Sequence, residues 1–167
     1  MATLWLVGMM GVGKSTVGPL VAALLGRPFI DLDDVIRARA GLSIPDVFAA
    51  EGEAGFRRRE AAALRATAGS EAVVACGGGV VVDEGNVALL RRSGRVAWLS
   101  APAEVLERRV GDGAGRPLAG TDGAEVGRRL AARAAGYAAA ADWEVATAGR
   151  SPQEVAEEVV QRWSEST

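Results

Sequence analysis

Five short apolar runs are spaced along the chain, each with the length of a β-strand: Thr3–Val7, Pro28–Leu32, Ala72–Cys76, Arg95–Leu99 and Trp143–Thr147. Between them the apolar positions recur with helical spacing, as in the segment from Thr16 to Leu25. Strands that alternate with helices in this way predict right-handed crossovers and a parallel sheet. We therefore expect the α/β class, in a three-layer α/β/α arrangement around a five-stranded parallel sheet.

Two segments have the sequence pattern of a helix N-terminus. Ser151-Pro152-Gln153-Glu154 has the form of a capping box with proline at the first helical position, and Ser43-Ile44-Pro45-Asp46 is similar. The segment of about 111–123 is instead rich in glycine and poor in apolar residues, which predicts a mobile lid. Since no linker or repeat interrupts the pattern, residues 1–167 are expected to form one domain.

A glycine-rich loop follows the first predicted strand. Gly8-Met9-Met10-Gly11-Val12-Gly13-Lys14-Ser15 matches the spacing of a phosphate-binding P-loop, and a helical pattern follows it. Backbone N–H groups of such a loop and of the helix N-terminus bind phosphate oxygens, and the Ser15 hydroxyl would ligate Mg²⁺. The alternative is a glycine-rich turn with an incidental lysine.

Lys14 is the single lysine among 19 basic residues. An ammonium is a compact point charge that fits between two phosphates, whereas a guanidinium is a wide planar fork. The use of lysine at this one place predicts ATP or GTP as ligand.

Composition narrows the possible partners. The net charge is −2, and the basic and acidic residues are spread along the chain, which favours a small anionic ligand over nucleic acid. One cysteine excludes an internal disulfide, and the lack of histidine leaves proton transfer to a carboxylate. No basic leader or long apolar run is present, so we expect a cytoplasmic protein without membrane contact.

Two carboxylates, Asp31 and Asp33, flank Leu32 at the end of the second predicted strand. Strand alternation would put both on one side, at the edge where the P-loop opens. One could orient water around Mg²⁺ while the other accepts a proton from an attacking hydroxyl. The alternative is that Asp33 or Asp34 only caps the next helix.

Gly77-Gly78-Gly79 follows the third predicted strand, again at its carboxyl end. Three glycines allow a backbone to approach a ligand closely, with N–H groups free to donate. We interpret them as a ligand-facing loop, with a tight turn as the alternative.

The stretch from Gly52 to Glu60 has a helical pattern in which Glu53, Arg57 and Glu60 share one face. Two carboxylates can then hold the Arg57 guanidinium in a pose suited to bidentate binding of a carboxylate. A plain surface ion-pair ladder is the alternative. Arg58 and Arg59 point elsewhere and are expected to be solvated.

Three further arginines stand alone, and each could be an ordinary surface charge. Arg133 lies on the helix after the expected lid and Arg150 follows the last strand. Arg116, within the lid, is a candidate to close over a transferred phosphoryl group.

Taken together, these motifs resemble the shikimate kinase family of small P-loop kinases. The matching residues occur in family order over nearly the whole chain and are Gly8 to Thr16, Phe29 to Asp33, Ser43-Ile44, Gly52-Glu53, Phe56-Arg57, Glu60, Gly77 to Gly79, Arg116 to Leu118, Arg133, Tyr137 and Arg150 to Pro152. The resemblance implies ATP-dependent phosphorylation of the 3-hydroxyl of shikimate, on the route to chorismate and the aromatic amino acids.

The resemblance also implies roles for individual residues. Gly11, Val12, Gly13, Lys14, Ser15 and Thr16 would hold the ATP phosphates, Ser15 would ligate Mg²⁺, and Asp31 would orient its water shell. Asp33 would bind shikimate and act as the base, within a substrate-binding segment of about 33–60. Arg57, Gly78 and Arg133 would also bind shikimate. Arg116 would act with Lys14 on the phosphates, and Arg150 would lie against the adenine.

The chain departs from the family pattern between Arg133 and Tyr137, where Ala134-Ala135-Gly136 replaces the usual proline and leucine. Cys76 also precedes the triple glycine, where threonine or another small residue is common; we expect it to be buried and inert. A gluconate kinase and a nucleotide-binding regulatory module remain as alternatives, and a monomer is expected.

Overall fold

The computed structural model describes residues 2–110 and 123–167. Its centre is a five-stranded sheet of β1 (Thr3–Val7), β2 (Phe29–Asp31), β3 (Val73–Ala75), β4 (Gly94–Ser100) and β5 (Trp143–Ala146). All pairings are parallel and the order is β2-β3-β1-β4-β5, so β1 lies in the middle. The expected parallel sheet is confirmed. The expected lid and Arg116 lie outside the described residues.

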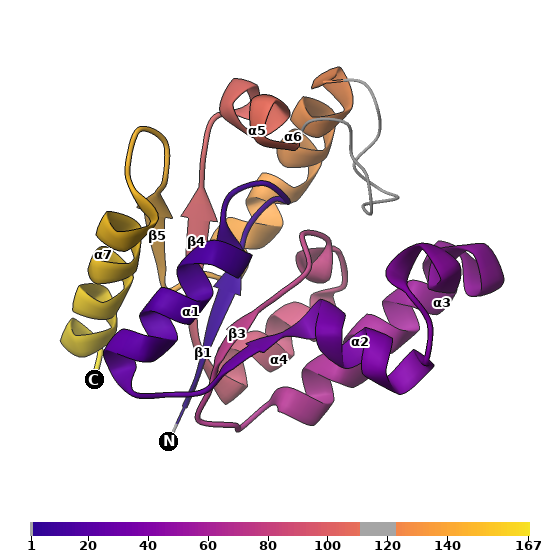
Figure 1. Ribbon diagram of the computed structural model, residues 1–167, viewed down its shortest axis with the longest axis horizontal. Helices are drawn as coiled ribbons and strands as arrows, with labels where there is room; N and C mark the ends of the chain where they lie inside the picture. Colours follow the sequence, from indigo (N-terminus) through magenta and orange to yellow (C-terminus); the bar gives the residue numbers. More distant parts are fainter. Residues whose placement is uncertain (1, 111–122) are drawn as a thin grey trace.

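Helices cover both faces of the sheet (Figure 1). On one face α1 (Lys14–Leu25) packs against α7 (Pro152–Glu165), and on the other α4 (Glu84–Ser93) packs against α6 (Gly123–Ala140). The helices α2 (Leu32–Ala40) and α3 (Ile44–Thr67) pack together beside β2, and α5 (Ala103–Val110) lies on α6. The three-layer α/β/α architecture is therefore confirmed.

The core explains why the apolar runs form strands. All five residues of β1 and all three of β3 are buried, because helices cover them from both sides. In β5 burial alternates along the strand, which fits its place at the sheet edge. The short 3-10 helix η1 (Val80–Val82) continues from the triple glycine into α4.

The predicted helix starts are present. Ser151 and Glu154 form a reciprocal capping box at α7, and the Ser43 side chain accepts a hydrogen bond from the Asp46 amide at α3. The expected helical stretch is confirmed from Glu53 to Glu60, whereas Gly52 at its start is not helical. Gly52 has φ 70° and ψ −175°, so α3 breaks there into two helical pieces. A positive φ suits glycine, which has no Cβ to clash.

Candidate active site

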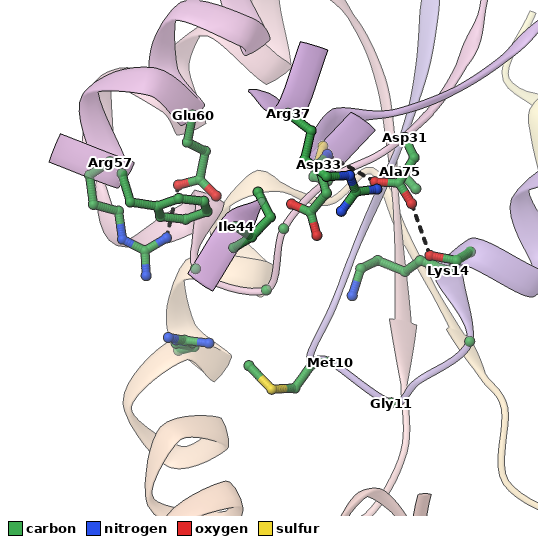
Figure 2. Close-up of a pocket in the computed structure, with 18 of the residues that line it drawn as sticks. Met10, Gly11, Lys14, Asp31, Asp33, Arg37, Ile44, Arg57, Glu60 and Ala75 are labelled. Atoms are coloured by element: carbon green, nitrogen blue, oxygen red, sulfur yellow. Dashed lines mark hydrogen bonds and ion pairs between the residues drawn. The ribbon is translucent and has the colours of Figure 1, made fainter. Parts of the chain in front are cut away.

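A pocket of about 470 Å³ opens at the carboxyl ends of β1, β2 and β3 (Figure 2). This is where parallel α/β sheets bind ligands, because the loops that leave neighbouring strands meet there. The lining residues are Met10, Gly11 and Gly13 to Thr16 of the loop after β1, Asp31, Asp33 and Arg37 around the start of α2, Ile44, Phe48, Phe56, Arg57 and Glu60 of α3, Ala75 to Gly79 after β3, and Arg133 of α6. Most of the predicted site residues are thus brought together.

The P-loop joins β1 to α1 as the sequence predicted. Gly13 is the N-cap of α1 with φ 107°, a left-handed conformation that suits glycine, and its carbonyl accepts from the Thr16 and Val17 amides at 3.1 and 2.8 Å. Lys14 is buried and donates hydrogen bonds to the Gly8 and Met9 carbonyl oxygens at 2.5 and 2.9 Å. Its ammonium therefore lies inside the curl of the loop, where a nucleotide phosphate can replace carbonyl oxygens as its partner.

Ser15 and Asp31 meet beneath the loop. The Ser15 hydroxyl donates to Oδ2 of Asp31 at 3.0 Å, while Oδ1 of Asp31 accepts from the Asp33 amide at 2.9 Å. Asp31 is thus the N-cap of α2, a role that the sequence had offered only to Asp33 or Asp34. Leu32 already belongs to α2, so strand alternation is the wrong reason for placing both carboxylates together. Both nevertheless line the pocket.

The Ser15 and Asp31 oxygens are a donor set that fits Mg²⁺. This ion prefers hard oxygen ligands and binds proteins through one or two side chains plus water and phosphate. Within residues 2–110 and 123–167, no group of three or more acidic, cysteine or histidine side chains could hold a metal by itself.

Arg57 is held by two carboxylates on its own helix. Its guanidinium lies 2.9 Å from Glu60 and 3.6 Å from Glu53, which confirms the predicted clamp. Glu60 is only 1% exposed, and burial raises the pKa of its carboxyl above the ordinary 4.5 while the charge of Arg57 opposes the rise. Figure 2 shows this pair in the wall formed by α3.

Arg59 lies outside the pocket and its side chain is about one-third exposed, where its guanidinium forms a surface ion pair with Glu51. Its Nε and Nη2 atoms each donate to a different carboxylate oxygen of Glu51, both at 2.7 Å. Residues eight apart in a continuous helix are separated by about 12 Å along its axis. The break at Gly52 brings Glu51 back within reach. Arg58 is exposed, as expected.

Each glycine of the triple loop faces a different neighbour. A Cβ on Gly77 would lie 2.7 Å from Oε2 of Glu60, one on Gly78 would lie 3.3 Å from the Met10 amide nitrogen, and one on Gly79 would collide with the Arg57 guanidinium. Any side chain here would displace the α3 wall or crowd the P-loop. The predicted ligand-facing loop is consistent with this placement, since all three glycines line the pocket.

Arg133 reaches the pocket from α6 despite the unusual sequence that follows it. Its Nη1 atom lies 3.9 Å from the Met9 sulfur and would lie 3.4 Å from a Cβ on Gly78. Arg133 and Arg57 therefore border the same cavity. Two arginines in one small pocket are suited to a carboxylate ligand.

Arg150 lies apart from this pocket. Its guanidinium donates to the Ala146 carbonyl at 2.9 Å and to Glu158 at 2.6 Å, near the start of α7. A different arginine, Arg109 at the end of α5, reaches the P-loop instead. It donates to the carbonyl of Val12 at 3.4 Å and to the Thr147 hydroxyl at 3.1 Å.

Arg109 was not predicted as a site residue, because it is one of two adjacent arginines, Arg108 and Arg109, in an ordinary amphipathic helix. Nothing in its local pattern separates it from a surface charge. Its significance comes from the packing of α5 over the loop after β1, which no local signal reports.

Cys76 is buried at the end of β3, as expected. Burial raises the pKa of its thiol well above the ordinary value, and the nearby charge of Glu60 adds to the rise. A thiol held protonated in this way is a poor nucleophile, so Cys76 serves as a small packing residue.

Comparison with known proteins identifies the family. The family model described as "Shikimate kinase" matches residues 10–164. A shikimate kinase of Symbiobacterium thermophilum is 48% identical over 165 residues, which cover 96% of this chain and 95% of that one. The chain belongs to the shikimate kinase family. The solved structure of the Acinetobacter baumannii shikimate kinase in complex with shikimate matches with a TM-score of 0.95 and 33% identity, covering 100% of this chain and 95% of that one.

A more distant likeness shows how widely the architecture is shared. A gluconokinase of Sinorhizobium meliloti superimposes with a TM-score of 0.59 at 18% identity, over 99% of this chain and 94% of that one. At this level only the fold is common to shikimate kinases and the gluconokinase. Across the part of the chain that is described, no helix is long and apolar enough to cross a membrane.

Proposed function

We propose that this protein transfers the γ-phosphoryl group of ATP to the 3-hydroxyl of shikimate, giving shikimate 3-phosphate and ADP on the route to chorismate and the aromatic amino acids. The observation that carries the proposal is a single pocket that joins a P-loop to a carboxylate at Asp33 and a pair of arginines at Arg57 and Arg133. Shikimate offers one carboxylate for the arginines and several hydroxyls for Asp33. The 48% identity to a curated shikimate kinase supports the same substrate.

The phosphate side of the reaction falls to the P-loop. Amides from Gly11 to Thr16 would bind the phosphate oxygens, and Lys14 would turn from the Gly8 and Met9 carbonyls to the transferred group. Mg²⁺, held through Ser15 and the water shell at Asp31, would neutralise phosphate charge when bound. Arg116 remains the proposed arginine over the phosphates, and Arg109 and Arg150 are the proposed contacts near the nucleoside.

The acceptor side falls to Asp33. Its carboxylate would accept the proton of the attacking 3-hydroxyl as the new oxygen–phosphorus bond forms and the bond to the β-phosphate oxygen breaks. Arg57, Gly78 and Arg133 would hold the rest of shikimate, which fixes the hydroxyl in line with the phosphoryl group.

A substrate panel tests the proposal. ADP release, coupled to NADH oxidation, is measured with ATP and Mg²⁺ in the presence of shikimate or gluconate. We expect turnover with shikimate and none with gluconate. Turnover with gluconate and none with shikimate would overturn the assignment. Calorimetry addresses the regulatory alternative, which predicts that ATP binds while saturating shikimate gives neither heat nor turnover.

Three finer points belong to the same proposal. Activity should depend on Mg²⁺, so excess EDTA should abolish it and added Mg²⁺ restore it. The protein should elute as a monomer in size-exclusion chromatography with light scattering. We also place the enzyme in the cytoplasm, where ATP is available.

A further inference from the structure

The triple-glycine loop has an unusual distribution of backbone hydrogen bonds. The Gly77 and Gly79 carbonyls accept from the Val80 and Val82 amides, both at 3.1 Å, in the turns that lead into η1. The Gly78 carbonyl accepts from the hydroxyl of Tyr137. All three carbonyl oxygens are therefore taken up by the protein.

The amides of the same loop differ from its carbonyls. Among the described residues, none of the three glycine N–H groups donates to a protein acceptor, and all three glycines line the pocket. A trans peptide points its carbonyl and its N–H in opposite directions. The Gly77 and Gly78 carbonyls share their peptides with the Gly78 and Gly79 amides, so holding these two carbonyls on the protein side turns those two N–H donors toward the pocket.

Two of these carbonyls are fixed locally and one is not. The bonds to Gly77 and Gly79 come from residues three positions along the chain, whereas the bond to Gly78 comes from 59 positions away. Glycine has the largest backbone freedom of any residue, so a Gly78–Gly79 peptide without a partner can rotate. Tyr137 alone, in the described structure, fixes the orientation of this peptide.

Tyr137 is itself firmly held. It is fully buried, and its ring stacks on Trp98 with centroids 5.7 Å apart. Burial raises the pKa of its phenol to about 12, which keeps the hydroxyl protonated and able to donate at neutral pH. Gly136 beside it lets α6 approach η1, because a Cβ there would lie 3.0 Å from Val81.

We propose that Tyr137 is a positioning residue that locks the Gly78–Gly79 peptide, so that the loop after β3 presents N–H donors to a substrate oxygen. Tyr137 does not line the pocket itself; it acts through Gly78, and its hydroxyl also interacts with the Arg133 side chain. The inference rests on the proposed function in taking this loop as a wall of the shikimate site. Helix α6 would then contribute two residues next to Gly78: Tyr137, and Arg133 one turn earlier.

Tyr137→Phe removes one oxygen and leaves the ring. Loss of a hydrogen bond of this kind should raise the KM for shikimate roughly 3- to 10-fold, with little change in kcat or in the KM for ATP. Thr67→Val is the matched control, because Thr67 is also buried and donates its hydroxyl to helix carbonyls outside the pocket. It should leave both KM values unchanged. A Tyr137→Phe enzyme with the parental KM for shikimate would overturn the proposal.

Two further measurements do not depend on turnover. In ¹⁵N NMR spectra of the free protein, Tyr137→Phe should shift the amide signals of Gly78 and Gly79, and unchanged signals would refute the lock. Tyr137 is the only tyrosine, so 3-fluorotyrosine incorporation labels it alone if Tyr137→Phe does not fold. Saturating shikimate should then shift the single ¹⁹F line, and an unmoved line contradicts the proposal. If the parent protein lacks shikimate kinase activity, the proposed function fails while the glycine signals still decide the role of Tyr137.

Discussion

The guanidinium of Arg57 and the carboxylate of Glu60 pair at 2.9 Å in the wall of the pocket, with Glu60 almost wholly buried behind the arginine. The pair sits directly against the triple glycine, since side chains on Gly77 and Gly79 would meet Glu60 and Arg57 respectively. Arg57 is therefore fixed from behind while one side of its guanidinium stays available to the cavity.

The first prediction concerns this arginine. Arg57→Ala should raise the KM for shikimate by about 10- to 100-fold, because a charge-assisted hydrogen bond contributes roughly 1.5–3 kcal/mol. The KM for ATP should stay near the parental value. Arg58→Ala removes the exposed neighbour and serves as the control in steady-state assays. An unchanged KM for shikimate in Arg57→Ala would rule out the carboxylate clamp.

Asp33 is the predicted base. Asp33→Asn keeps the shape but cannot accept the proton, so kcat should fall by roughly 10²- to 10⁴-fold. ATP binding, measured by calorimetry, should persist. Asp46→Asn is the matched control, because Asp46 is exposed and does not line the pocket. Near-normal turnover in Asp33→Asn would remove Asp33 from this role.

Substitution of Lys14 tests whether the P-loop needs a lysine or only a positive charge. Its Nζ lies within 2.9 Å of two loop carbonyls, a space that a planar guanidinium does not fit. Both Lys14→Ala and Lys14→Arg should lose activity by roughly 10²-fold or more. Full activity in Lys14→Arg would show that charge alone is enough.

The buried carboxyl of Glu60 predicts a pH dependence of stability. Since burial raises its pKa in the folded state above 4.5, the folded protein binds this proton more tightly than the unfolded chain. The contribution of Glu60 to stability is therefore complete at pH values below 4.5 and is lost as pH rises through the folded-state pKa.

Urea unfolding of the parent protein and of Glu60→Gln, at pH values from below 4.5 upward, measures how this carboxyl changes the free energy of unfolding. The free energy of unfolding of the parent should decline relative to that of the variant as pH rises. If the free energy of unfolding of the parent, relative to that of Glu60→Gln, stays constant or increases as pH rises, the raised pKa of Glu60 is contradicted.

Much of this architecture was predictable because its signals are local. Buried parallel strands are short apolar runs, so β1 and β3 could be located from the sequence alone. The P-loop and the spacing around Arg57 are likewise set by neighbours within one turn.

The remaining features depend on contacts that are distant in the sequence. The central position of β1 follows from its pairing with β3 and β4, which the local sequence of the strand does not indicate. The Glu51–Arg59 pair forms only because Gly52 breaks the helix between them. Arg109 meets the P-loop only once α5 has packed over it.

A pocket wall made of bare peptide also constrains how selectivity can vary. The segment from Gly77 to Gly79 has no side chain that ionises, so its donors keep the same strength across the range of acidity in which enzymes work. A new side chain here would also have to displace the ends of Glu60 or Arg57 or crowd the Met10 amide. We therefore expect a changed preference for a different polyol acid to arise from the side chains of α3 or α6 that line the same pocket.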